Sequence, residues 1–159
     1  MSSDPSSYKE LLLSNLELGR ELSARTLMFH AAIAERVGLS ATEHKALDIL
    51  SRSRAMTAGQ LAEVTGLTTG AITGLTDRLE KVGFVRRERD VSERRKVMIY
   101  PVMEKIEQEI APLFISMSQQ TEQLLSRYSE QELAIIQDFI QRSIVLLQEE
   151  TNKLKSSGG

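Results

Sequence analysis

Apolar residues recur along most of this chain at intervals of three, four or seven, the spacing of helices that bury one side. A long stripe near the start contains Leu11, Leu18, Leu22, Phe29 and Ile33, and a similar one near the end contains Leu133, Ile136, Ile140, Ile144 and Leu147. The pattern therefore predicts a mostly α fold. Only the segment between Phe84 and Pro101 departs from it.

Local sequence pairs mark where these helices begin and end. A hydroxyl residue followed three positions later by Glu or Gln predicts a capping box, and a glycine at the far end predicts a stop. Such boxes occur at Ser7 and Glu10, Ser40 and Glu43, Thr57 and Gln60, and Ser129 and Glu132; the stops are Gly38, Gly66 and Gly83. After Pro101 we expect two helices, from about Met103 to Leu125 and from Ser129 to about Lys153.

The two short helices after Thr57 and Thr68 are separated by a turn of about three residues, the spacing of a helix-turn-helix. In the second, Ile72, Leu75, Leu79 and Val82 form a stripe expected to be buried, and the opposite face carries Gly70, Thr73, Gly74, Asp77 and Lys81, flanked by Thr69 and Arg78. Small residues and a long cation suit close approach to a major groove. An acid on this face must either accept from a cytosine amine or be neutralised, and we expect Arg78 or Lys81 to neutralise Asp77.

Two short runs of strand-like composition follow, Phe84–Arg89 and Lys96–Pro101, and they flank a polar tip at Asp90–Arg94. Between Arg78 and Lys96 there are eight basic and four acidic residues, whereas the whole chain has a net charge of −2. Positive charge is thus concentrated on one predicted hairpin, as a phosphate-binding surface requires.

Together these features predict a winged helix-turn-helix that binds double-stranded DNA. The candidate contacts are Thr68, Thr69, Gly70, Thr73, Gly74, Arg78, Arg87, Arg94, Arg95 and Lys96. The alternative is a winged helix that regulates nothing, either an architectural DNA binder or a protein-interaction module. Preference for one site over random duplex would distinguish a regulator from an architectural binder.

The long helices at both ends have wider apolar faces than a small winged domain can cover. We therefore expect an obligate homodimer, with an intramolecular helical bundle as the alternative. The expected organisation is a helical dimerisation region at 7–36 and 103–153, a winged helix-turn-helix domain at 39–102, and flexible termini at 1–6 and 154–159.

Composition excludes several other classes. The chain has no cysteine, which rules out disulfides and thiolate zinc sites within it. It has neither a secretory leader pattern nor an apolar run of membrane-spanning length, so we expect a cytoplasmic protein without a membrane partner. No serine stands in a nucleophile-elbow context and the carboxylates are scattered, so we expect neither an enzyme nor a cofactor.

With these elements placed, the chain resembles the MarR family of bacterial transcriptional regulators over nearly its whole length. The matching segments are Leu39–Glu43, Leu61–Ala62, Asp77–Gly83 and Asp90–Arg95. The last is the most specific, because the family wing typically has Asp-Pro-x-Asp-Arg-Arg and this chain has Asp-Val-Ser-Glu-Arg-Arg.

The resemblance implies that Arg94 enters the minor groove at the wing tip, and that a dimer places its recognition helices in successive major grooves of a pseudo-palindrome. It also implies a pocket for a small aromatic or anionic effector that releases a repressor from DNA. The residues in that region are Phe29, His30, Ile33, Arg36, Leu113 and Met117.

Glu43 and His44 resemble two ligands of the family's zinc-sensing branch. The further histidines of that branch are absent, since Met103–Leu125 contains none and the chain has only His30 and His44. We therefore expect no metal site, with His44 a partly exposed helix residue and His30 at a pocket edge or interface.

Overall fold

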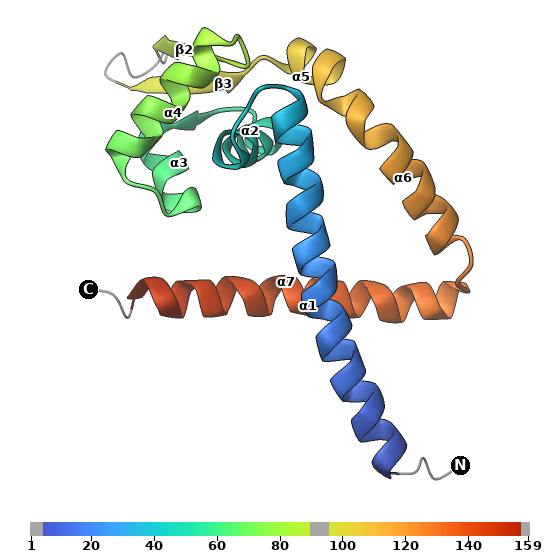
Figure 1. The fold of residues 1–159 in the computed structure, drawn as a ribbon. Coiled ribbons are helices and arrows are strands. Elements are labelled where there is room, and N and C mark those ends of the chain that lie inside the picture. Colours follow the sequence, from blue (N-terminus) through green and yellow to red (C-terminus); the bar gives the residue numbers. More distant parts are fainter. Residues whose placement is uncertain (1–4, 90–95, 157–159) are drawn as a thin grey trace. The chain divides into compact units, whose positions relative to one another are not determined.

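The computed structural model describes residues 5–89 and 96–156 (Figure 1). Its elements are, in chain order, α1 (Pro5–Arg36), α2 (Ala41–Ser53), β1 (Met56–Thr57), α3 (Ala58–Thr65), α4 (Thr69–Lys81), β2 (Val85–Arg89), β3 (Val97–Pro101), α5 (Met103–Glu109), α6 (Ala111–Leu125) and α7 (Glu130–Ser156). The chain forms two compact units, one ending at Leu113 and the other starting at Phe114.

The first unit contains a small antiparallel sheet in the order β1-β3-β2. Val85 lies opposite Pro101 and Arg89 opposite Val97, so β2 and β3 form the predicted hairpin, each starting one residue later than expected. The sequence did not predict β1, in which Met56 lies opposite Ile99. Two residues are too few to show the alternation by which strands are recognised.

The core of this unit is formed by apolar side chains from α2, α3, α4, the sheet and the turn that precedes β2. The largest fully buried ones are Leu47, Leu50, Leu61, Ile72, Leu79, Phe84 and Ile99. Burying each contributes roughly 1.5–3 kcal/mol, which holds α4 against the helices and strands behind it. Val82, expected in the same stripe, is 44% exposed. The helix ends at Lys81, Val82 is its C-cap, and Gly83 turns the chain with φ +80°, so helical periodicity no longer applies there.

The single helix expected from Met103 to Leu125 is wrong, because the structure divides it into α5 and α6 at Ile110. Pro112 has no N–H with which to continue the ladder of hydrogen bonds, and its ring disfavours a continuous helix. Instead, the Leu113 N–H donates to the Ile110 carbonyl at 3.0 Å. The apolar spacing that predicts one helix carries no information about Pro112.

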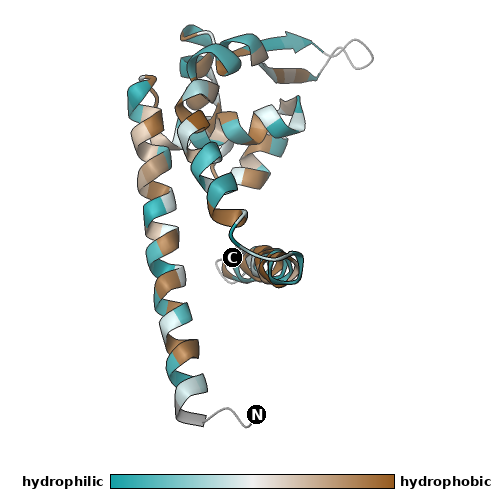
Figure 2. Cartoon of the chain, turned by 90° about the vertical axis from the view of Figure 1, so that its right-hand side faces the viewer, coloured by the Kyte–Doolittle hydropathy of each residue, from teal (hydrophilic) through white to brown (hydrophobic). Residues whose placement is uncertain are grey.

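The long helices α1 and α7 expose many apolar side chains. Figure 2 shows apolar residues recurring along α1. The exposed set includes Leu11, Leu16, Leu18, Leu22 and Leu27 on α1, and Ile135, Phe139, Ile144, Leu146 and Leu147 on α7. No helix among the described residues is long and apolar enough to cross a membrane.

The helix ends agree with local capping rules at most positions. The predicted box before α7 is present, since the Ser129 N–H donates to Glu132 Oε2 at 2.8 Å and the Glu132 N–H donates to Ser129 Oγ at 3.3 Å. Helix α1 begins at Pro5 rather than near Ser7, and proline is a common first residue of a helix. Of the predicted flexible termini, 1–4 and 157–159 lie outside the described residues.

Candidate nucleic-acid interface

Capped helix ends position α3 and α4. The Thr57 N–H donates to Gln60 Oε1 at 2.9 Å and the Gln60 N–H donates to Thr57 Oγ1 at 3.2 Å, so the predicted capping box opens α3. Gly66 ends α3 with φ +75°, a left-handed conformation that glycine adopts without steric cost. Thr68 then caps α4 by accepting the Ala71 N–H at 3.2 Å. This confirms the predicted helix-turn-helix boundaries.

The outer face of α4 carries Thr69, Gly70, Thr73 and Gly74, all exposed. A Cβ added at Gly70 or at Gly74 would meet nothing within 4 Å, and neither glycine has a positive φ. Glycine inside a helix costs about 1 kcal/mol relative to alanine. No contact among the described residues therefore requires glycine at these two positions, and both suit a partner that approaches the backbone closely.

Arg78 on α4 is anchored to α2. Its Nε donates to Oε1 of Glu43, and Oε2 of Glu43 accepts the Ser40 N–H at 2.7 Å as part of the α2 capping box. Burial by itself raises the pKa of Glu43, but hydrogen bonds from the Ser40 backbone and from Arg78 outweigh it, and the pKa lies below the ordinary value of 4.5. An ionised Glu43 thus orients a guanidinium that remains 67% exposed.

Asp77 is neutralised by Arg87, and the expected pairing with Arg78 or Lys81 is wrong. Arg87 Nη1 lies 2.6 Å from Asp77 Oδ1 and 2.9 Å from Glu80 Oε2. Arg87 Nη2 donates to the hydroxyl of Thr76, which is buried. The guanidinium of this predicted DNA contact is therefore held within the chain.

The rest of the hairpin carries further cations. Arg86 lies over the ring of Tyr100, with its Cζ 5.3 Å from the ring centroid, and Lys96 is exposed just before β3. Arg94 and Arg95 lie outside the described residues.

The predicted effector residues in the first unit have different environments. The rings of Phe29 and His30 have centroids 6.0 Å apart, and those of His30 and His44 are 5.5 Å apart, which brings the end of α1 against α2. Ile33 is buried in the core, Arg36 is exposed, and Leu113 is half-buried. His44 is only 5% exposed, so the expectation of a partly exposed residue is wrong.

The environment of His44 lowers the affinity of its imidazole for a proton. Burial is the main cause of its pKa lying below the ordinary value of 6.5, and the nearby His30 adds to the effect. Glu43, its neighbour, is engaged by Ser40 and Arg78. Among the described residues, no group of three or more His, Cys, Asp or Glu side chains could hold a metal ion.

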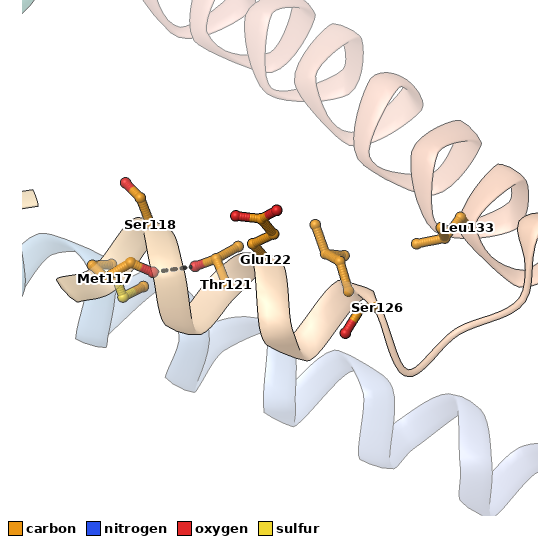
Figure 3. A pocket seen from close by; sticks show the side chains of 7 residues that line it. Met117, Ser118, Thr121, Glu122, Ser126 and Leu133 are labelled. Atoms are coloured by element: carbon orange, nitrogen blue, oxygen red, sulfur yellow. Dashed lines mark hydrogen bonds between the residues drawn. The ribbon is translucent and has the colours of Figure 1, made fainter. Parts of the chain in front are cut away.

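Met117, the remaining predicted effector residue, lies in the second unit and lines an open, mostly apolar groove of about 580 Å³ between α6 and α7. Figure 3 shows the side chains that line it, including Met117, Thr121 and Glu122 on α6 and Leu133 on α7.

Sequence reasoning missed the tertiary partners of the two arginines. The capping pattern of Ser40 and Glu43 predicts a partner for one carboxylate oxygen of Glu43 but not for the other. The charge pattern predicts Arg87 only as one more cation on a basic hairpin. The available signal was Asp77 itself, an acid on a face that otherwise suits DNA.

Comparison with known proteins agrees with this geometry. The model of the MarR family matches residues 39–97. The chain is 42% identical over 149 residues to YcgE of Bacillus subtilis, an uncharacterised HTH-type transcriptional regulator, covering 94% of this chain and 96% of that one.

Solved structures show the same fold. One is a MarR family protein from Bacillus stearothermophilus, with a TM-score of 0.68 and 24% identity over 94% of this chain and 99% of that one. Another is a mutant of MepR from S. aureus bound to an oligodeoxyribonucleotide, with a TM-score of 0.57 and 20% identity over 84% and 97% of the two chains.

Proposed function

The chain belongs to the MarR family, and from this premise we propose that this DNA-binding transcriptional regulator is a repressor. It binds a pseudo-palindromic operator as a homodimer and leaves it when a small aromatic or anionic ligand binds. The observation that carries the proposal is the outer face of α4, where small exposed residues adjoin a guanidinium held in place by Glu43.

We propose that α4 reads base edges and that the hairpin of β2 and β3 contacts the DNA backbone and the minor groove. The proposed contacts on α4 are Thr68, Thr69, Gly70, Thr73, Gly74 and Arg78, and those on the hairpin are Arg94, Arg95 and Lys96. Threonine hydroxyls and methyls can contact base edges, and each good base contact discriminates by about 1–3 kcal/mol. Arg87 is left out because its guanidinium is occupied inside the chain.

We propose that residues 39–102 form the DNA-binding domain and that 7–36 and 103–153 form the dimerisation region. The exposed apolar side chains of α1 and α7 support this division, because monomeric soluble proteins rarely expose contiguous apolar patches of that extent. A two-fold dimer would cover such surfaces with the same surfaces of a second copy.

We propose that the effector binds near Phe29, His30, Ile33, Arg36 and Leu113. Apolar walls with a polar handle suit an aromatic acid, and His30 or Arg36 can meet its carboxylate. Release follows only if the ligand favours a dimer whose recognition helices no longer match one turn of DNA.

Selection from a randomised duplex library tests the regulator proposal. We expect an enriched palindrome with half-sites centred about 10 bp apart, one helical turn. We also expect the selected duplex to bind about 10³-fold or more tightly than random duplex. Equal affinity for both would instead indicate an architectural DNA binder, and no affinity for either would indicate a protein-interaction module.

A further inference from the structure

We propose that Arg87 is a positioning residue, which fixes the hairpin of β2 and β3 against α4 and does not itself contact DNA. The inference rests on the proposed DNA contact of that hairpin. Arg87 lies in the middle of β2, opposite Ile99 of β3, and its side chain is 25% exposed.

The guanidinium of Arg87 joins β2 to about two turns of α4, from Thr73 to Glu80. Its Nη1 contacts the carboxylates of Asp77 and Glu80, and its Nη2 contacts the Thr76 hydroxyl and the Thr73 carbonyl, the last at 3.3 Å. A phosphate would have to displace two carboxylates that already neutralise this cation. Exchanging one anionic partner for another yields little interaction free energy. The Arg87 guanidinium should therefore stay on α4 when DNA binds.

The backbone strengthens the same connection. The Arg87 N–H donates to Glu80 Oε1 at 3.0 Å, so Glu80 binds both the main chain and the side chain of one residue. Within the sheet order β1-β3-β2, the strand β2 lies at an edge and has only β3 as a neighbour. Contacts to α4 therefore set how the hairpin is oriented relative to the recognition helix.

Arg87 also neutralises acids that face the proposed DNA. Asp77 lies on the outer side of α4 and is 59% exposed at its side chain, and Glu80 is 41% exposed. Without Arg87, two unpaired carboxylates would stand close to phosphates. Both consequences of losing Arg87, a loosened hairpin and two unpaired acids, depend on Asp77 and Glu80.

A double-mutant cycle tests this dependence, using the selected duplex as the probe. In the otherwise native chain we expect Arg87→Ala to weaken binding by about tenfold or more, and in a background of Asp77→Asn with Glu80→Gln by less than about threefold. An arginine that touches DNA directly would cost the same in both backgrounds. Equal losses would overturn the proposal.

A neutral, buried change provides a second measurement. Thr76 is 1% exposed and cannot reach DNA, yet its hydroxyl accepts from Arg87. We expect Thr76→Val to lower the ratio of selected to random duplex affinity, because a misoriented hairpin loses fit to one site before it loses general attraction. An unchanged ratio would contradict the proposal. Partial unfolding would lower both affinities equally, and thermal unfolding of each variant detects it.

Arg86→Ala is the matched control, since it removes the same charge from the next residue of β2 without touching the contacts to α4. We expect it to weaken binding equally in both backgrounds. If Arg87→Ala does not fold, Arg87→Lys replaces it, because an ammonium keeps the charge but not the forked contacts. The loss of DNA affinity caused by Arg87→Lys should likewise disappear in the background of Asp77→Asn with Glu80→Gln.

Lys96→Ala distinguishes failure of this inference from failure of the proposed function. If Lys96→Ala weakens DNA binding while Arg87→Ala costs the same affinity in both backgrounds, only the positioning role of Arg87 is wrong. If neither Lys96→Ala nor Arg94→Ala weakens binding, the hairpin does not contact DNA, and the inference falls together with that part of the proposed function.

Discussion

At the scale of single residues, Gly70 and Gly74 are expected to lower the stability of α4 and to raise its affinity for DNA. Replacing Gly74 by alanine should stabilise α4 by about 1 kcal/mol, because alanine restricts the unfolded chain and the added methyl meets nothing within 4 Å. The same methyl would occupy the space of a base edge. We expect a higher melting temperature together with a loss of at least tenfold (about 1.4 kcal/mol) in affinity for the selected duplex.

Gly59→Ala in α3 is the control for this pair of effects. Gly59 lies in the first helix of the same helix-turn-helix, and the new methyl group would lie at an ordinary distance of 3.9 Å from Thr57 Oγ1. It should stabilise the protein and leave DNA affinity close to that of the native chain. A Gly74→Ala protein that gained stability and kept full affinity would show that α4 does not approach DNA through this face.

His44 makes stability depend on pH. Its pKa in the folded protein lies below 6.5, mainly because it is buried and secondarily because His30 is near. The unfolded chain therefore binds the proton more readily, so the stability contributed by neutral His44 is complete above about pH 6.5 and declines as pH falls below it. Thermal melts between pH 7.5 and 5.5 should show this decline, and His44→Gln should reduce it. An identical decline in His44→Gln would assign the effect to other groups.

At the scale of elements, the tip of the hairpin should dominate general affinity for DNA. The resemblance implies that Arg94 enters the minor groove, where a guanidinium responds to groove width more than to base identity. We expect Arg94→Ala to weaken binding severely, and almost equally for duplexes of similar groove width. The slope of log affinity against log salt should fall by about 0.9 for one lost phosphate contact. A loss under about threefold with an unchanged slope would contradict this role.

The elements differ in how far the sequence could predict them. Capping pairs such as Thr57 and Gln60 act over three residues, so their pattern is visible along the chain and the structure confirms it. Strand β1 exists only through its pairing with β3, and residues 56 and 57 are too few to show the alternation of a strand. Arg78 reaches Glu43 across 35 positions, a contact decided by how α2 packs on α4. Residue types predicted which surface is basic, but not which arginines the fold uses internally.

At the scale of the whole molecule, ligand binding should couple stability to DNA release. A salicylate-like acid that binds near Phe29 and His30 must raise the melting temperature, because it binds the folded state. It lowers operator affinity only if it favours the dimer that fits DNA less well. We expect both effects together, and both reduced in Phe29→Ala. If a broad set of aromatic acids changed neither quantity, the protein would be a constitutive repressor.

A charge added to the exposed apolar face of α7 should have different effects in a monomer and in the proposed dimer. Phe139 and Leu147 on α7 are 69% and 67% exposed in the single chain. In a monomer, replacing either by glutamate would place a charge in water and should be harmless. In a dimer held together by α1 and α7, the same charge would be buried at an interface without a partner, at a cost of several kcal/mol. We therefore expect Phe139→Glu and Leu147→Glu to shift the chain from dimer to monomer in sedimentation velocity and to abolish binding to the palindromic duplex, while a single half-site is bound weakly.

Gln141→Glu adds the same charge to the same helix at an already polar position and should leave the dimer intact. If Phe139→Glu and Leu147→Glu both remained dimeric and bound the palindrome normally, this face of α7 would not be part of the interface.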